Sequence, residues 1–133
     1  MYCLDTDIIV FHLKGNTKVN EKIKEVKSLK KEISITYITL YELYKGVYTS
    51  AKQKEDLKYL DVLLKDIDLI NLSINSSDIA GKIYSKLKGN GELINDADIL
   101  IASLAIANNK ILVTGNIKHF GRIKELKIEN WLL

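Results

Sequence analysis

Two aspartates stand at the start of the most apolar stretch of the chain. Asp96 and Asp98 lead into residues 99–107, an almost wholly apolar run of helix-favouring residues, and this pattern predicts a buried helix. Asn95 or Asp96 is the expected N-cap, so Asp98 falls in the first turn, where free N–H groups and the helix dipole favour an anion. Because successive residues turn by about 100°, Asp98 shares a face with apolar residues and Asp96 points away. Helix capping and ligation of a metal ion are the two interpretations of these acids.

Two further acids occur where strands and helices would bring a ligand-binding site together. Asp5 ends the apolar run 1–4, and Glu42 lies in a segment of helical periodicity. Ligands of parallel sheets bind beyond the carboxyl ends of the strands, so Asp5, Glu42 and Asp98 are candidates to line one cleft. Two carboxylates about 4 Å apart repel by about 4 kcal/mol at an effective dielectric constant of about 20, so such a cluster needs shared protons or a cation. Oxygen-only ligation suits Mg²⁺ or Mn²⁺, and acid-held metals recur in nucleases.

Each acid also has a purely structural explanation. Asp5 can cap the helix that follows it, and Asp98 can interact with the dipole of its own helix. The helical wheel places Glu42 beside Lys45 and opposite the apolar stripe of its helix, which predicts a solvent-exposed side chain. Residue types and spacing therefore permit a metal-dependent nuclease without establishing one.

Hydrophobic periodicity predicts the elements that must position these acids. The expected strands are residues 1–4, 33–36, 67–72, 111–114 and 127–131. The expected helices are residues 8–13, 18–31, 39–47 and 51–65, a helix that Ser76 or Ser77 caps and that ends near Lys88, and the helix that begins at Asn95 or Asp96. Strands separated by helices require crossover connections, which predicts an α/β fold with a central parallel sheet flanked by helices, in a single domain over residues 1–133.

Composition restricts the class of protein. The chain has 133 residues, of which 47% are hydrophobic, as expected for one domain with a substantial core. The formal net charge of +3 allows contact with nucleic acid without requiring it. The single Cys3 excludes an internal disulfide and a cysteine-rich zinc site, and we expect it to be buried. The sequence predicts neither a signal peptide nor a membrane span, so the expected location is a reducing cytoplasm.

Four short runs occur in order along nearly the whole chain. They are Leu4-Asp5-Thr6-Asp7, the segment from Ile38 to Gly46 around Glu42, the segment from Asp96 to Ala102, and Leu112-Val113-Thr114-Gly115-Asn116. Together with Phe120 and the closing segment 128–131, these runs resemble the PIN-domain ribonucleases. More narrowly, they resemble the VapC-type toxins of prokaryotic toxin–antitoxin pairs.

The resemblance implies a function and a set of site residues. Asp5, Glu42 and Asp98 match the family's three acids, which would coordinate Mg²⁺ or Mn²⁺ and orient a water molecule for attack on an RNA phosphodiester. Asp96 matches a frequent accessory acid of the metal site. The implied protein is therefore a metal-dependent endoribonuclease that acts as a toxin.

The residues around these acids partly follow the family pattern and partly depart from it. Thr6 and Thr114 match the small hydroxyl residues that support the acids. Asp7 stands where an amide often occurs, and the region of Asn116 and His119 carries no acid where relatives commonly have a fourth one. This difference predicts weak binding of a second metal, although Asn116 can still orient a water molecule or a ligand. We expect His119 to be a surface or hydrogen-bonded histidine rather than a catalytic base.

Two alternatives from other functional classes fit part of the sequence. The run from Leu4 to Asp7 also looks like the start of haloacid-dehalogenase-type phosphatases, in which Asp5 would be the nucleophile and Asp7 the acid. That class needs a later pair of acids introduced by a glycine, and Gly91 is too loosely placed relative to Asp96 and Asp98 to introduce them. The class also gives Glu42 no role. The other alternative is a catalytically degenerate PIN domain that only binds RNA or protein, which the three intact acids oppose.

The sequence also carries an indication of partners. Four tyrosines, Tyr41, Tyr44, Tyr48 and Tyr59, lie among leucines and lysines, and tyrosines suit both protein interfaces and packing over a sheet. The resemblance implies a homodimer, silenced by an antitoxin whose basic side chain reaches the acids and competes with metal. The RNA target is not encoded in any motif of the chain, because RNA is read through exposed bases and folded shape.

Overall fold

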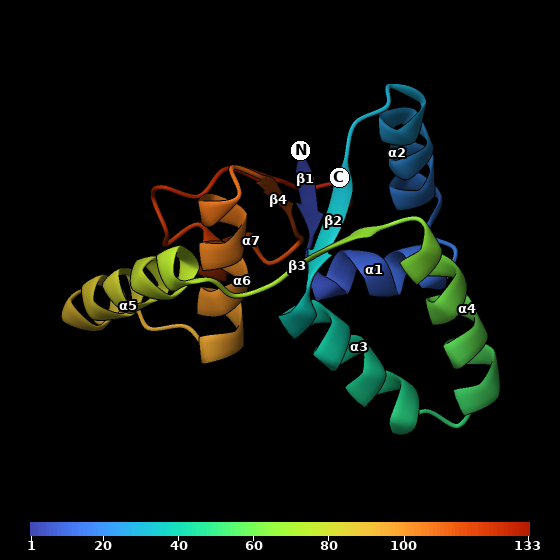
Figure 1. Ribbon diagram of the computed structural model, residues 1–133, viewed down its shortest axis with the longest axis horizontal. Helices are drawn as coiled ribbons and strands as arrows, with labels where there is room; N and C mark the ends of the chain where they lie inside the picture. Colours follow the sequence, from blue (N-terminus) through green and yellow to red (C-terminus); the bar gives the residue numbers. More distant parts are fainter.

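Five short strands form one parallel sheet through the centre of the molecule (Figure 1). The computed structural model describes residues 1–133. The strands are β1 (Tyr2–Leu4), β2 (Ile33–Thr36), β3 (Asp68–Ile70), β4 (Ile111–Val113) and β5 (Ile128–Glu129), in the spatial order β3-β2-β1-β4-β5. Every neighbouring pair is parallel, so the predicted α/β fold with a parallel sheet is confirmed. Because β1 is central, Asp5 emerges between β2 and β4.

Seven helices cover the two faces of this sheet. They are α1 (Thr6–Leu13), α2 (Thr17–Ser28), α3 (Tyr37–Tyr48), α4 (Gln53–Lys65), α5 (Ile74–Gly89), α6 (Asp96–Ala107) and α7 (Ile117–Phe120). Figure 1 shows α1 to α4 on one side of the strands and α5 to α7 on the other. Side chains of β1 alternate between the two resulting cores, since Tyr2 and Leu4 pack with residues of α1 to α4 and Cys3 packs with residues of α5 and α6.

Several helix boundaries differ from the sequence-based prediction. The expected cap of α5 at Ser76 or Ser77 is wrong, because Ser73 is the N-cap and Ser76 completes a capping box with it. Helix α1 begins at Thr6, two residues earlier than expected, with Asp5 as its N-cap. Helix α7 was not predicted, since a single turn is too short to show hydrophobic periodicity.

The single cysteine is buried, as predicted. Cys3 is fully enclosed, and burial raises the pKa of its thiol to about 12. A thiol in this state is a structural side chain rather than a reactive one. None of the helices combines the length and apolar character that crossing a membrane would require.

Candidate active site

Asp5 lies at the carboxyl end of the central strand and also caps helix α1. Its Oδ1 accepts the backbone N–H of Thr6 at 2.8 Å, and its Oδ2 accepts the hydroxyl of Thr114, also at 2.8 Å. Burial, with only 6% of the residue exposed, raises the pKa of Asp5 to about 7, and the charges of Asp7 and Asp98 add to the rise. The two interpretations of Asp5 are thus compatible, because the same carboxyl group caps a helix and belongs to a cluster of acids.

Glu42 reaches the same region from helix α3. Its Oε1 accepts the hydroxyl of Thr6 at 2.6 Å, and the residue is half-buried. The prediction of a solvent-exposed Glu42 is therefore wrong. The helical wheel identified the face of α3 that packs on the sheet core, but it could not show that α1 packs against α3 from another side. That second contact encloses Glu42.

Asp98 completes the set of acids from the first turn of helix α6. The N-cap is Asn95, whose Oδ1 accepts the backbone N–H of Asp98 at 2.8 Å and whose amide donates to Asp98 Oδ2 at 3.2 Å. Burial raises the pKa of Asp98, contact with His119 opposes that rise, and the charge of Glu42 adds to it. Asp96 is exposed beside it, as expected from its position on the helix.

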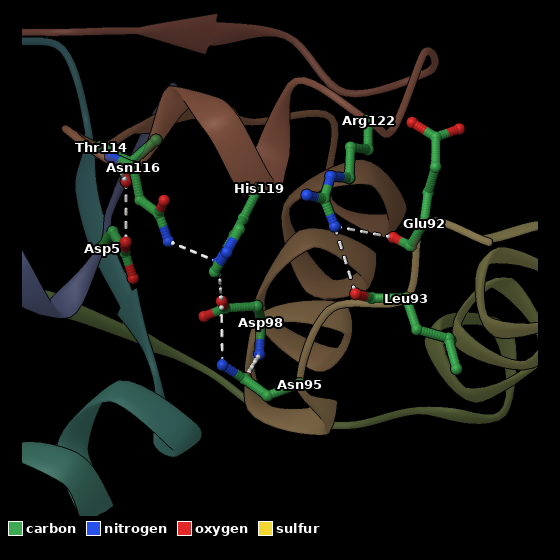
Figure 2. A network of polar contacts seen from close by, with 9 residues as sticks. All are labelled: Asp5, Glu92, Leu93, Asn95, Asp98, Thr114, Asn116, His119 and Arg122. Carbon is green, nitrogen blue, oxygen red and sulfur yellow. Dashed lines mark hydrogen bonds and ion pairs between the residues drawn. The ribbon is translucent and has the colours of Figure 1, made fainter. Parts of the chain in front are cut away.

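The loop after β4 closes the site opposite α6. Thr114 accepts the backbone N–H of Asn116 at 3.0 Å while its hydroxyl donates to Asp5. Asn116 Nδ2 lies 3.1 Å from His119 Nδ1, which in turn lies 3.6 Å from Asp98 Oδ2. Figure 2 shows these contacts as a continuous chain from Asp5 to Asp98. His119 is hydrogen-bonded, as expected, but it lies inside the acidic site, a placement that depends on the unpredicted turn α7.

Asp7 lies beside the cleft and holds the backbone of the loop after β4. Its Oδ2 accepts the N–H of Gly115 at 3.0 Å, and its Oδ1 is buried without a partner. Burial raises the pKa of Asp7, and the Gly115 hydrogen bond opposes the rise. A Cβ on Gly115 would lie 2.7 Å from Leu132 Cδ1 and 3.0 Å from Asp7 Oδ2, so a larger residue here would have to displace the ends of these two side chains. This structural role leaves Asp7 poorly placed to act as the acid of a phosphatase.

Arg122 supports the Asp98 side of the site. Its guanidinium donates to the carbonyl oxygens of Glu92 and Leu93 at 3.1 and 3.2 Å. These bonds join the segment after α7 to the loop that leads into α6 (Figure 2). Sequence reasoning missed this residue, because a contact to backbone carbonyls leaves no signal in the identity of the partner residues.

The donor set fits a divalent cation. Asp5, Glu42 and Asp98 offer only oxygen atoms, and their charges act on one another, since Asp98 raises the pKa of Asp5 and Glu42 raises that of Asp98. As the side chains stand, no three His, Cys, Asp or Glu residues lie close enough together to hold a metal ion. Ionised carboxylates repel one another at short range, so the three acids are expected to stand apart until a cation neutralises them.

Comparison with known proteins shows the family of the chain. The PIN domain family model matches residues 2–126. Ribonuclease VapC2 of Rickettsia felis is 37% identical over 131 residues, which cover 98% of each chain, and Ribonuclease VapC1 of Haemophilus influenzae is 28% identical over 132 residues, again covering 98% of each chain. The crystal structure of VapBC2 from Rickettsia felis bound to a promoter DNA fragment contains a chain that superposes with a TM-score of 0.92, at 36% identity and 98% coverage of each chain. The chain therefore belongs to the PIN-domain family and, within it, to the VapC ribonucleases.

Proposed function

We propose that this protein is the toxin of a type II toxin–antitoxin pair and that it cleaves RNA phosphodiester bonds as a Mg²⁺- or Mn²⁺-dependent endoribonuclease. The observation that carries the proposal is the convergence of Asp5, Glu42 and Asp98, which come from distant parts of the sequence to the carboxyl edge of one parallel sheet. Nuclease names among relatives support it, including a tRNA(fMet)-specific endonuclease VapC of Shigella flexneri that is 27% identical over 131 residues.

Each residue around the acids has a defined part in this proposal. Asp5, Glu42 and Asp98 would hold the cation, which when bound activates water and stabilises charge that develops on the phosphate. The hydroxyls of Thr6 and Thr114 hold two of these carboxylates in place by donating to Glu42 and Asp5.

The remaining site residues lie at the edge of the acidic cluster. Asp96 is exposed at the start of α6, where it would serve as an accessory metal ligand. Asn116 follows the Thr114 turn and has its amide nitrogen directed at His119, which suits it to orient a water molecule or a ligand.

The decisive experiment is RNA cleavage by the purified protein with Mg²⁺, with Mn²⁺ and with EDTA. We expect cleavage with either cation and none with EDTA. Asp98→Asn should lower the rate by about a hundredfold or more, since loss of a ligand charge affects metal affinity and transition-state charge together. Asp96→Asn is the matched control, the same change two positions away, and should be milder. Undiminished cleavage by the Asp98 variant would contradict the proposal. Equal losses of cleavage rate in the two variants would show that Asp96 contributes to the site as much as Asp98.

The same preparation distinguishes the two alternative functions. Hydrolysis of a generic phosphate monoester without cleavage of RNA would favour a haloacid-dehalogenase-like phosphatase. A protein that binds RNA, cleaves nothing and gains no thermal stability from Mg²⁺ would be a degenerate PIN domain, because a bound ligand stabilises the folded state.

A groove beside the acids is suited to an antitoxin segment. It lies between α1, α3 and α4, has a volume of about 270 Å³, and is lined mainly by apolar side chains that include Leu13, Leu43 and Leu60. Glu42 lines this groove and also belongs to the acidic cluster. A peptide with apolar residues in the groove can therefore place a basic side chain among the acids, where it would compete with metal.

Solved relatives include VapBC complexes, and we propose a cognate antitoxin for this chain as well. Expression of this protein alone, in the cytoplasm where we place its action, should arrest growth. Coexpression with the neighbouring antitoxin gene should relieve the arrest. Harmless overproduction of the unaltered protein would contradict the toxin assignment.

A further inference from the structure

His119 is one of only two histidines in the chain, and it stands inside the acidic site. Its Nδ1 lies 3.1 Å from Asn116 Nδ2 and 3.6 Å from Asp98 Oδ2. Its side chain is 39% exposed, whereas that of Asp98 is 14% exposed. One ring nitrogen therefore faces an amide nitrogen and a carboxylate oxygen at the open side of the site, as Figure 2 shows.

These two neighbours make different demands on the same nitrogen. A neutral imidazole nitrogen is either a donor or an acceptor. An unprotonated Nδ1 has a single lone pair, which can accept the amide hydrogen of Asn116 at 3.1 Å or bind a cation, but not both. Oδ2 of Asp98, 3.6 Å away, is too far for a hydrogen bond to Nδ1. A cation between Nδ1 and Asp98 Oδ2 would therefore bind this lone pair in place of the Asn116 amide.

The charge of the site is also uncompensated by basic side chains. The salt bridges of the protein include none from Asp5, Glu42 or Asp98 to a lysine or arginine, and His119 is the only basic side chain paired with any of the three. The side chains that face the ring are Asp98 from α6 and Asn116 from the loop after β4. No lysine or arginine of the protein occupies this position.

We propose that His119 supplies a nitrogen ligand to the divalent cation that Asp98 binds, so that the site prefers Mn²⁺ to Mg²⁺. This inference rests on the metal-dependent function proposed above. Mg²⁺ favours oxygen ligands in strict octahedral geometry, whereas imidazole is a common ligand of transition-metal ions. A mixed set of carboxylate oxygen and imidazole nitrogen thus discriminates between two cations that an oxygen-only site would treat more equally.

Pulsed electron paramagnetic resonance of the Mn²⁺-loaded protein tests the inference directly. The protein is purified without a histidine tag, and modulation from a coordinated nitrogen is recorded. We expect modulation in the wild type that shifts on ¹⁵N-histidine labelling and disappears in His119→Ala. His12→Ala is the matched control, because His12 lies on α1 and is bonded to Asn20. That variant should retain the signal.

Calorimetric titration gives an independent measurement. The ratio of Mg²⁺ to Mn²⁺ dissociation constants should fall by about tenfold or more in His119→Ala, since loss even of a supporting group changes metal affinity by about ten- to a hundredfold. It should stay unchanged in His12→Ala.

The outcomes separate this inference from the proposed function. Mn²⁺ bound without nitrogen modulation in the wild type, or modulation that persists in His119→Ala, would overturn the role of His119 and leave the oxygen site standing. Failure of the wild type to bind Mn²⁺ in an Asp98-dependent manner would overturn both. Because the wild-type spectrum is decisive, the test holds even if His119→Ala does not fold.

Discussion

At the scale of single residues, the site consists of carboxylates fixed by hydroxyl groups. Thr114 has two roles at once, because its hydroxyl donates to Asp5 Oδ2 and accepts the N–H of Asn116. Thr6 similarly donates to Glu42 while its backbone N–H donates to Asp5. The threonines thus fix the orientation of acids that would otherwise repel one another and rotate apart.

Replacement of Thr114 tests this arrangement. Thr114→Val preserves the shape of the side chain but removes the hydroxyl, whose hydrogen bond lowers the pKa of Asp5. The backbone N–H of Asn116 then also lacks its acceptor. We expect a loss of about 1–3 kcal/mol in the free energy of unfolding, measured with urea, and slower RNA cleavage. Thr114→Ser keeps the hydroxyl and is the control. Equal stability and activity of the Val and Ser variants would show that the hydrogen bonds contribute little.

The raised pKa of Asp5 predicts how stability depends on pH. The pKa is raised from 3.8 to about 7 in the folded protein, so between these values the folded state binds more protons than the unfolded state. The free energy of unfolding therefore falls as pH rises through this interval, by an amount on the order of a few kcal/mol. Asp7 and Asp98 shift in the same direction.

Urea unfolding in EDTA across this interval would measure the effect. Asp5→Asn should flatten the profile, because the amide does not titrate. Mn²⁺ or Mg²⁺ added above neutral pH should recover stability in the wild type, since the cation binds the ionised form. Stability that rises with pH over the same interval in the metal-free wild type would be the opposite of this prediction.

At the scale of elements, periodicity was sufficient to predict most of the chain. The apolar run after Asp98 is the buried helix α6, Ile33–Thr36 is a strand as expected, and the order of strands and helices gives the parallel sheet. These features depend on local residue patterns. The exposure of Asp96 could be predicted in the same way, because the direction of its side chain depends only on its own helix.

Features that depend on contacts between elements could not be predicted in this way. Glu42 is enclosed because α1 packs against α3, and His119 enters the site because a single helical turn follows Asn116. Both Ser73 and Ser76 are residues that can cap a helix. Ser73 is the cap of α5 because the two serines form the reciprocal hydrogen bonds of a capping box, which residue type alone does not reveal. The resemblance to a family implies a metal-binding role for Glu42 that the pattern of its own helix does not indicate.

Asn95 allows the cap of α6 to be separated from the positioning of Asp98. Asn95→Ser keeps an oxygen that can accept the N–H of Asp98 but removes the amide that donates to Asp98 Oδ2. Asn95→Ala removes both, and should lower the free energy of unfolding by about 1 kcal/mol. We expect the Ser variant to be nearly as stable as the wild type but slower in RNA cleavage. Full activity of the Ser variant would show that the Asn95 amide does not position Asp98.

At the scale of the whole molecule, the acidic site lies where the two cores meet. Leu4 belongs to the core beneath α1 to α4, Cys3 belongs to the core beneath α5 and α6, and Asp5 follows directly at the edge of the sheet. Glu42 and Asp98 come from helices on opposite sides of the strands (Figure 1). Any movement of one helical layer against the other would therefore change the separation of the acids. The Arg122 bonds act within one layer, where they hold the loop that leads into α6 to the segment after α7.

Three of the four tyrosines on α3 and α4 are exposed. Tyr41, Tyr48 and Tyr59 are 64%, 58% and 59% exposed, and Tyr44 stacks on Tyr48 with ring centroids 6.3 Å apart. The packing of Tyr44 is intramolecular, but the three exposed rings leave apolar area in water that a second protein surface would cover. We therefore predict a homodimer in solution, in which these rings lie at or near the interface.

Light scattering over a range of protein concentrations would measure the state of association. Tyr41→Glu places a charge where burial is expected and should shift the protein towards monomer, since taking a charge out of water at an interface core costs free energy even with Lys45 nearby. Lys24→Glu, an exposed change on α2, is the control and should leave association unaltered. The groove proposed for the antitoxin is lined by Tyr59 but not by Tyr41. A Tyr41 variant that becomes monomeric but is still neutralised by antitoxin would therefore show that the dimer and the antitoxin use different surfaces. A wild type that is monomeric at every concentration would exclude the tyrosines as a dimer interface.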